Sequence, residues 1–287
     1  MSATATRPAV TDSHPAHVRN NAPVGVFDSG LGGLYLLREI RKRAPSERLL
    51  YLSDHARFPY GPRPLAEVRA FATQITRWLR AEGAKLIAIA CNTASAAALH
   101  RLREAFPDTP FIGMEPAVKP AVASTNTGTV GVLATEATFQ GELFSSLLER
   151  VAGDATVLTQ ACPGLVELVE QDEQDSTRAR TLVRRYINPL LEHGADTLVL
   201  GCTHYSFLKP LLQEVAGPGV TIIDPAPAVA EQVTRVLTEQ GLSRGTTGDA
   251  APPIVVCTND YTQAGRLSNQ AHLLLGEPVQ ARVVELT

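Results

Sequence analysis

GAKLIAIACNT, residues 83–93, and GADTLVLGCTH, residues 194–204, align without a gap and bring Cys91 and Cys202 into register. In both stretches a Gly-Ala pair ends a helical pattern, a short apolar run predicts a strand, and the cysteine follows at the strand's carboxyl end. Ser95 and Ser206 coincide in the same alignment. The repeat predicts two similar α/β halves of the chain.

The order of strand and then helix recurs along the whole sequence. Short apolar runs precede turns or helical patterns, and the first of them is followed by a glycine-rich turn and a helical pattern over Leu34–Arg43. These predicted strands cover residues 24–27, 49–52, 86–90, 129–133, 197–200 and 220–223. Such alternation is typical of βαβ units on parallel sheets. A weaker repeat pairs residues 25–27 with residues 131–133.

We therefore expect two parallel-sheet α/β domains related by pseudo-twofold symmetry, with the active site in the cleft between them. Residues 22–116 and 225–287 are predicted to form the first domain, and residues 117–224 the second. Residues 1–21 mix Ala, Thr, Ser, Pro and His without periodicity, and they are interpreted as a mobile tail.

Composition excludes several classes of function for the 287-residue chain. The 26 Lys and Arg residues against 29 Asp and Glu residues give a net charge of -3, which provides no electrostatic basis for binding nucleic acid. No apolar run approaches the ~18 residues of a membrane span. No signal-peptide pattern is present, and the four cysteines include no C-x-x-C pair. We expect a cytoplasmic protein with reduced thiols.

The two aligned cysteines are the strongest candidates for chemistry. Ligands of open α/β sheets bind outside the carboxyl ends of the strands, where Cys91 and Cys202 are expected. A following helix is expected to lower each thiol's pKa and to favour thiolate at neutral pH. One thiol from each half would flank a single substrate. Inverting a carbon that bears an acidic hydrogen needs two such groups, chemically alike, because reversing the reaction exchanges their roles.

Other interpretations of the cysteines stay open from the sequence. A single buried cysteine is often only a small core residue, and for Cys162 and Cys257, which have no counterpart in the repeat, this structural interpretation is favoured. A metal site from Cys91, Cys202 and His204 would need a further ligand that no local spacing supplies. A redox disulfide between Cys91 and Cys202 would depend on closure of the two halves.

Polar residues at the predicted strand ends converge on the same crevice. Asp28 can accept a proton or hold an ammonium group and Ser29 can bind a carboxylate, although a helix N-cap is the alternative for this pair. The turn at Gly30, Gly32 and Gly33 lacks the G-x-G-x-x-G spacing of nucleotide sites, and close approach to a small anion fits it better.

The residues after each cysteine are candidates for holding an amino-acid carboxylate. Asn92 and Thr93 follow the first cysteine, and Thr203 and His204 follow the second. Their amides and hydroxyls would lie at helix starts, which are suited to anions. His204 is also placed to tune the Cys202 thiol or to polarise the substrate.

Four ordered motifs together resemble the cofactor-independent glutamate racemases of bacteria, within the aspartate/glutamate racemase superfamily. They are GVFDSGLGG at residues 25–33, YLSDHARFPYG at 51–61, ACNTASA at 90–96 and GCTHY at 201–205. The resemblance runs from about residue 24 to residue 229. It implies reversible interconversion of L- and D-glutamate without a cofactor or metal, supply of D-glutamate for peptidoglycan synthesis, and a cytoplasmic homodimer.

The resemblance also implies roles for individual residues. Cys91 and Cys202 would be the alternating proton donor and acceptor, assisted by Asp28 and His204. Glu170 falls where the family has an assisting glutamate downstream of a Cys-Pro pair; taken alone it would be a solvated charge on a helix. The residues implied to contact glutamate are Asp28, Ser29, Tyr60, Gly61, Asn92, Thr93, Thr203 and His204.

Several positions depart from the usual family pattern. Ser53 and His55 stand where family members commonly have Gly and Thr, and Ala117, Ser206 and Pro225 are further departures. They affect the expected pocket shape and the strictness of glutamate selection rather than the reaction type. A racemase of aspartate or a hydantoin, a noncatalytic two-lobed amino-acid-binding protein and a Cys–His hydrolase are the competing hypotheses.

Overall fold

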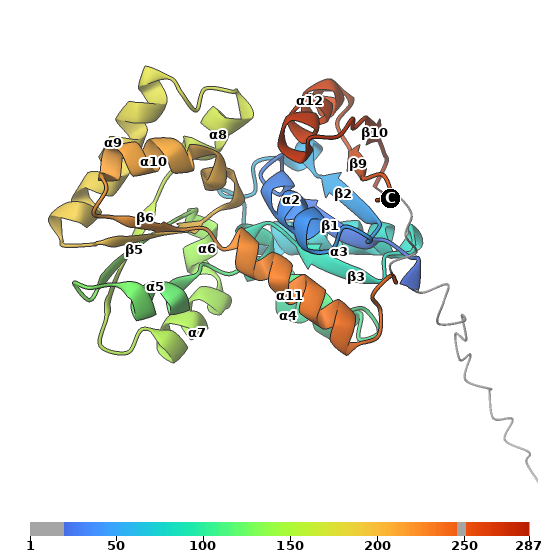
Figure 1. Cartoon of the computed structure of the whole chain (residues 1–287), viewed down its shortest axis with the longest axis horizontal. Coiled ribbons are helices and arrows are strands. Elements are labelled where there is room, and N and C mark those ends of the chain that lie inside the picture. Colours follow the sequence, from blue (N-terminus) through green and yellow to red (C-terminus); the bar gives the residue numbers. More distant parts are fainter. Residues whose placement is uncertain (1–19, 246–250, 287) are drawn as a thin grey trace, which may run out of the picture.

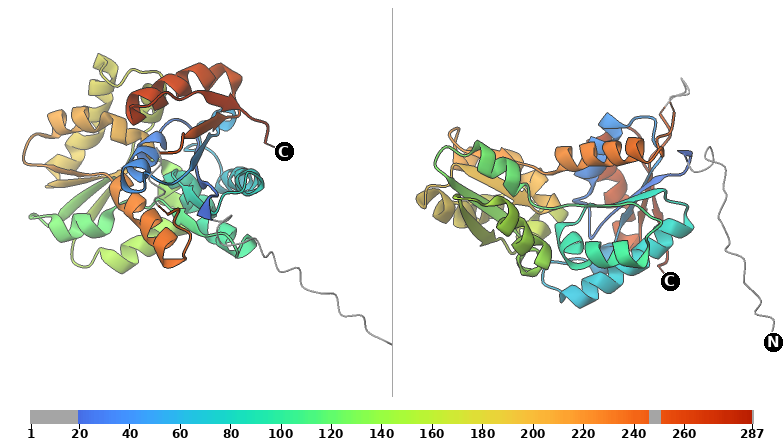
Figure 2. Two further views of the ribbon diagram at one scale, coloured as in Figure 1. Left: turned by 45° about the vertical axis from the view of Figure 1, so that its right-hand side comes forward. Right: turned by 90° about the horizontal axis from the view of Figure 1, so that it is seen from below.

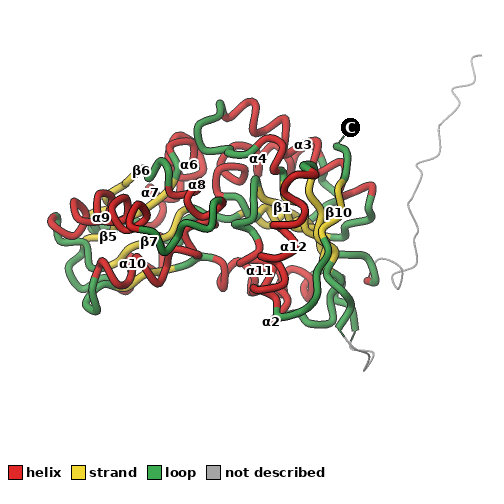
Figure 3. Tube along the Cα trace, turned by 90° about the horizontal axis from the view of Figure 1, so that it is seen from above, coloured by secondary structure: helices red, strands yellow, loops and turns green. Residues whose placement is uncertain are grey.

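Two parallel β-sheets form the cores of two lobes that lie side by side (Figure 1). The computed structural model describes residues 20–245 and 251–286. Within that part of the chain, the first sheet has the order β10-β9-β2-β1-β3-β4 and the second has the order β6-β5-β7-β8. Figure 3 shows the strands as two separate groups. The predicted fold class is confirmed.

The strands of the first sheet come from both ends of the chain, and those of the second from its middle. The first sheet contains β1 (Val24–Asp28), β2 (Leu49–Ser53), β3 (Leu86–Ile89), β4 (Phe111–Gly113), β9 (Val255–Thr258) and β10 (Ala281–Val283). The second sheet contains β5 (Thr129–Ala134), β6 (Thr156–Ala161), β7 (Thr197–Gly201) and β8 (Thr221–Ile223). Every neighbouring pair within each sheet is parallel.

The internal repeat of the sequence corresponds to a repeat of topology. The order β2-β1-β3-β4 in the first sheet matches the order β6-β5-β7-β8 in the second. The aligned segments therefore contain the equivalent strands β3 and β7, and the weaker repeat falls on β1 and β5. From β1 the chain passes to β2 on one side and then returns to β3 on the other side, and β5, β6 and β7 follow the same course. Each cysteine therefore follows a strand at a topological switch point.

Helices cover the faces of both sheets (Figure 2). They are α2 (Leu34–Arg43), α3 (Leu65–Ala81), α4 (Asn92–Ala105), α5 (Val118–Ser124), α6 (Glu136–Gln140), α7 (Glu142–Val151), α8 (Leu165–Glu170), α9 (Thr177–Glu192), α10 (Lys209–Ala216), α11 (Ala226–Glu239) and α12 (Ala264–Leu275), with 3-10 turns η1 (His55–Arg57), η2 (Thr203–Leu208) and η3 (Tyr261–Gln263). None of these described helices has the length and apolarity needed to cross a bilayer.

Apolar patterning explains why these elements form. The strands β1, β2, β3 and β7 are buried at every residue, as expected of parallel strands covered by helices on both faces. The long helix α3 buries Val68, Ala72, Ile75 and Leu79, which recur every three or four residues and so share one helical face.

The chain passes from the second lobe back to the first after β8. Helix α11 follows that strand and packs on α2 of the first lobe, as Figure 1 shows. This crossing agrees in place with the expected return near residue 225, although the proposed domain boundaries themselves stay predictions. The expected N-terminal tail lies outside the described residues except for Asn20 and Asn21.

Four strands were not foreseen from the sequence. β4 and β10 have three residues each, and β6 is an edge strand whose sequence TVLTQA contains no apolar run and whose positions are exposed or half-buried. β9 carries only a short apolar stretch before polar residues. A second difference concerns Cys202, which is followed by the 3-10 turn η2 rather than by an α-helix.

The loop between β1 and α2 contains a close backbone approach that requires glycine. A Cβ atom on Gly33 would lie 2.8 Å from Asp28 Cβ and 2.9 Å from Ala90 Cβ. Cβ atoms are fixed by the backbone and cannot rotate away. Glycine is therefore required here because a side chain would not fit, and not because of its backbone angles.

We expect Gly33→Ala to lower the free energy of unfolding by about 1–3 kcal/mol, the usual cost of overpacking a filled site. Gly265→Ala is the matched control, because a Cβ on Gly265 meets nothing within 4 Å inside helix α12. That control should leave the free energy of unfolding unchanged or raise it by up to about 1 kcal/mol. Urea denaturation measures both; equal effects would refute the packing argument.

Candidate active site

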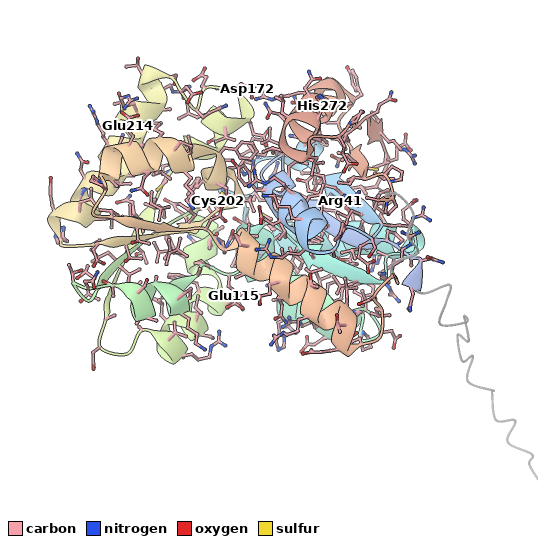
Figure 4. All side chains as sticks on the ribbon, in the orientation of Figure 1. Arg41, Glu115, Asp172, Cys202, Glu214 and His272 are labelled. Carbon is pink, nitrogen blue, oxygen red and sulfur yellow. The ribbon has the colours of Figure 1, made fainter. Side chains whose placement is uncertain are left out.

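Both aligned cysteines open onto one cavity between the lobes. The cavity has a volume of about 170 Å³, below the roughly 300–1,000 Å³ of drug-sized ligand sites, and so suits a small metabolite. Figure 4 places Cys202 at the junction of the two lobes. The predicted site residues that line the cavity are Ser29, Tyr60, Gly61, Cys91, Thr93, Cys202, Thr203 and His204.

Three predicted site residues are not in the cavity lining. Asp28, Asn92 and Glu170 are buried, and each contacts or neighbours a residue that does line the cavity. The sequence also missed part of the wall. The second lobe adds Thr135 and Glu136 after β5, and Cys162, Pro163, Gly164, Val166 and Glu167 at the start of α8.

Cys91 caps the amino end of α4, and its side chain is nearly buried. Burial, and after it the negative charge of Asp28, raise the pKa of the Cys91 thiol well above its ordinary value of 9.0. The backbone amide of Ala94 acts in the opposite direction but does not offset them. The expectation that a helix start would make this cysteine a thiolate at neutral pH is therefore wrong, because desolvation outweighs the helix amide.

Cys202 has a different neighbour. Its Sγ atom lies 3.9 Å from His204 Nδ1, and the other ring nitrogen, His204 Nε2, lies 2.8 Å from Glu170 Oε1. Burial by itself lowers the pKa of His204, but the hydrogen bonds and negative charges of Cys202 and Glu170 raise it well above 6.5. A protonated imidazole there attracts negative charge on Sγ.

Glu170, the last residue of α8, contacts both lobes. Its Oε1 accepts hydrogen bonds from the Leu31 amide and from His204 Nε2, both at 2.8 Å, and its Oε2 lies 3.1 Å from His55 Nε2. Burial by itself raises the pKa of Glu170, but the hydrogen bonds and charges of His204 and His55 hold it well below its ordinary value. The carboxylate is therefore ionised at neutral pH.

Asp28 also joins the lobes. Its Oδ2 accepts hydrogen bonds from the Gly33 amide at 2.7 Å and from the Thr203 hydroxyl at 3.0 Å. Gly33, and not Asp28, is the N-cap residue of α2. Within the described parts of the chain, Asp28 Oδ1 and both side-chain polar atoms of Asn92 have no hydrogen-bond partner. Leaving such groups unpaired costs about 1–3 kcal/mol each, so they favour a polar ligand.

The glycine turn lies in close contact with side chains of the second lobe, and its expected approach to a small anion stays a prediction. A Cβ atom on Gly32 would lie 2.6 Å from His204 Nδ1, and one on Gly30 would lie 3.0 Å from His204 Nε2 and overlap the Glu170 carboxylate. The turn therefore packs directly against second-lobe side chains.

A polar cluster behind Tyr60 was missed because β9 was missed. Tyr60 and Asn259 both donate hydrogen bonds to the buried Asp54 carboxylate, and Asn259 Oδ1 accepts one from the Ala56 amide at 3.0 Å. Burial raises the pKa of Asp54 despite these partners. Asn259 follows a strand at its carboxyl end, which is the signal that would have found it.

The remaining cysteines differ from each other in position. Cys162 lies in the cavity wall and its Sγ donates to Gln160 O at 3.3 Å; burial raises its pKa. Cys257 lies within β9, where burial raises its pKa to about 11. Among the described residues, no group of three or more His, Cys, Asp or Glu side chains is arranged to hold a metal ion.

Comparison with known proteins shows the family of this chain. Residues 34–233 match the family model for Asp/Glu/hydantoin racemases. The chain belongs to this racemase family. A glutamate racemase of Roseiflexus sp. is 54% identical over 222 residues, 77% of this chain and 82% of the relative. One from Ectopseudomonas mendocina is 47% identical over 268 residues, 92% of this chain and 99% of the relative.

Solved structures of this racemase family share the fold. A glutamate racemase isoform from Bacillus anthracis matches with a TM-score of 0.83 at 32% identity, covering 93% of this chain and 98% of that one. The Francisella tularensis glutamate racemase, solved in complex with D-glutamate, matches with a TM-score of 0.81 at 28% identity, over 93% and 98% of the two chains.

The pair of Glu170 and His204 predicts a pH window for the stability of this racemase-family chain. The lowered pKa of Glu170 gives stability that is present above its unfolded value near 4.3 and is lost as the pH falls through its folded pKa. The raised pKa of His204 gives stability that is present below about 6.5 and is lost as the pH rises through its folded pKa. Both contributions to stability are therefore fully present only between about pH 4.3 and about pH 6.5.

We expect Glu170→Gln to lower the free energy of unfolding by about 3 kcal/mol near pH 6, because it leaves a buried imidazolium without its counter-charge. The difference from the wild type should shrink below about pH 4.3 and above about pH 6.5. Denaturant titrations across pH measure it. Glu167→Gln, on the same helix, is the control. A difference that stays constant with pH would contradict the assignment.

Proposed function

We propose that the chain interconverts L-glutamate and D-glutamate, with Cys91 and Cys202 exchanging protons with opposite faces of the substrate Cα. The observation that carries this proposal is the shared cavity, to which each lobe contributes one thiol from the end of its equivalent strand. A cavity between two like acid–base groups is what inversion at a stereocentre needs. The relatives named as glutamate racemases support the choice of substrate.

In each direction one sulfur removes the Cα proton as a thiolate, and the electrons of the broken C–H bond pass to the substrate carboxylate system. The other sulfur then donates its proton to the opposite face, and the two sulfurs have exchanged protonation states. The surroundings of the two thiols differ: His204 Nδ1 lies beside the Cys202 sulfur, whereas burial and Asp28 raise the pKa of the Cys91 thiol. No cofactor enters the proposed steps.

Substrate recognition is proposed for the polar groups around the cavity. The amides and hydroxyls at the start of α4, from Asn92 and Thr93, suit a carboxylate. The unpartnered Oδ1 of Asp28 suits an ammonium group, and the side-chain amide of Asn92 is equally unpartnered within residues 20–245 and 251–286. Ser29, Tyr60, Gly61, Thr203 and His204 complete the proposed contacts.

The biological setting rests on the family resemblance. We propose that the D-glutamate feeds peptidoglycan synthesis in the cytoplasm and that the enzyme is a homodimer. A racemase of aspartate stays the competing substrate assignment; the aspartate racemase of Picrophilus torridus, at 18% identity and a TM-score of 0.50, shares the fold alone.

The purified, dialysed protein should racemise L-glutamate without added cofactor, followed by circular dichroism. In deuterated water each enantiomer should gain deuterium at Cα as it converts. Cys91→Ser and Cys202→Ser should each lower kcat by about 10²- to 10⁴-fold, the usual contribution of a positioned acid or base. Cys257→Ser, within β9 and away from the cavity, is the matched control and should keep wild-type activity.

Full racemisation by either cysteine variant of the site would refute the two-thiol scheme. Faster conversion of aspartate than of glutamate would favour the competing substrate. Tight binding of glutamate with no change in its optical signal would favour a noncatalytic binding protein, and a trapped acyl-thioester from an amide substrate would favour a hydrolase.

A further inference from the structure

A chain of polar contacts continues beyond His204 into the first lobe. Cys202 Sγ lies 3.9 Å from His204 Nδ1, His204 Nε2 lies 2.8 Å from Glu170 Oε1, Glu170 Oε2 lies 3.1 Å from His55 Nε2, and His55 Nδ1 lies 2.8 Å from Ser53 Oγ. All five residues are buried. Ser53 and His55 are two of the positions at which this sequence departs from the usual family pattern.

The contacts determine which atoms of His55 donate. Glu170 is ionised and can only accept, so His55 Nε2 carries the proton of that hydrogen bond. His55 Nδ1 lies 2.8 Å from the Ser53 hydroxyl, which can act there as donor or acceptor. Ser53 thus holds the ring in the orientation in which His55 presents an N–H group to Glu170.

The geometry points to His55 as a positioning residue for the half of the reaction carried out by Cys202. Glu170 has two oxygens with different tasks: Oε1 faces His204, and Oε2 accepts from His55. Removing the imidazole would leave Oε2 without that donor on a side chain only 9% exposed. The carboxylate would then rotate or bind a water molecule, and Oε1 would no longer be held in its hydrogen bond with His204 Nε2.

His55 is itself held rigidly. Asn259 accepts a hydrogen bond from the Ala56 amide in the same 3-10 turn, and the Phe58 ring contacts both imidazoles, with ring centroids 6.3 Å from His55 and 5.9 Å from His204. The first lobe thereby determines the orientation of a carboxylate that the second lobe carries. Cys91 has Asp28 as its charged neighbour instead, so we expect the effect to be confined to one thiol.

The proposal rests on the proposed racemase activity and is tested with a pair of variants of similar size. His55→Gln keeps a side-chain N–H donor for Glu170, and His55→Leu removes it. We expect kcat to fall about 10- to 100-fold in His55→Leu, the range found when an orienting group behind a functional residue is lost. His55→Gln should stay within a few-fold of the wild type.

The deciding measurement is the primary deuterium isotope effect with Cα-deuterated L- and D-glutamate. If Cys202 becomes a poorer base, its removal of the Cα proton limits the rate more strongly. The isotope effect should then rise for the enantiomer that Cys202 deprotonates and not for the other. His204→Asn identifies that enantiomer, and His55→Leu should change the same one. Tyr51→Phe is the control, because it removes a buried hydroxyl bonded to Gly30 O outside this chain of contacts.

Equal changes for both enantiomers in His55→Leu, or wild-type rates and isotope effects in that variant, would show that His55 has no such role. Should His55→Leu fail to fold, Ser53→Ala carries the same test, because it releases Nδ1 while keeping the imidazole. A wild-type protein that does not racemise glutamate refutes the proposed function instead, so the two failures are distinguishable.

Discussion

The carboxylate of Glu170 is the interaction on which the arrangement of the site depends. It accepts hydrogen bonds from the Leu31 amide and from His204, and lies beside His55, so that one buried charge is shared between a turn of the first lobe and the imidazole next to a second-lobe thiol. A buried carboxylate is tolerated only when it is paired and hydrogen-bonded. Separating the two lobes at this point would remove the Leu31 amide and His55 from the buried carboxylate, so these contacts help to hold the two walls of the cavity together.

The internal repeat places the cysteines equivalently, but their surroundings are not equivalent. Cys91 begins a 14-residue α-helix and faces a carboxylate, whereas Cys202 begins a 3-10 turn and faces an imidazole. The proposed inversion needs one charged and one protonated sulfur at any time. The two thiols have unlike neighbours within a symmetric topology, because an imidazole lies beside one sulfur and a carboxylate beside the other.

The same contact explains why the turn after β1 is rich in glycine. Side chains at Gly30 or Gly32 would occupy the space of Glu170, Thr203 and His204. The spacing of glycines in the sequence indicated a close approach but not these second-lobe neighbours. Asn259 was missed for a related reason: its role depends on β9 lying beside β2, and the pairing of Leu50 with Val255, residues far apart in the sequence, leaves no local pattern.

The sequence by itself determined the alternation of strands and helices, the doubled topology and the pair of thiols at equivalent strand ends, because burial of apolar runs and the geometry of βαβ units follow from local pattern. Helix α2 agrees with its predicted bounds for that reason. Only the tertiary structure decided the charge states and partners of the site residues. A pKa depends on burial and on charges from distant segments, so the raised pKa of the Cys91 thiol and the link from Ser53 through His55 to Glu170 exist only in the folded chain.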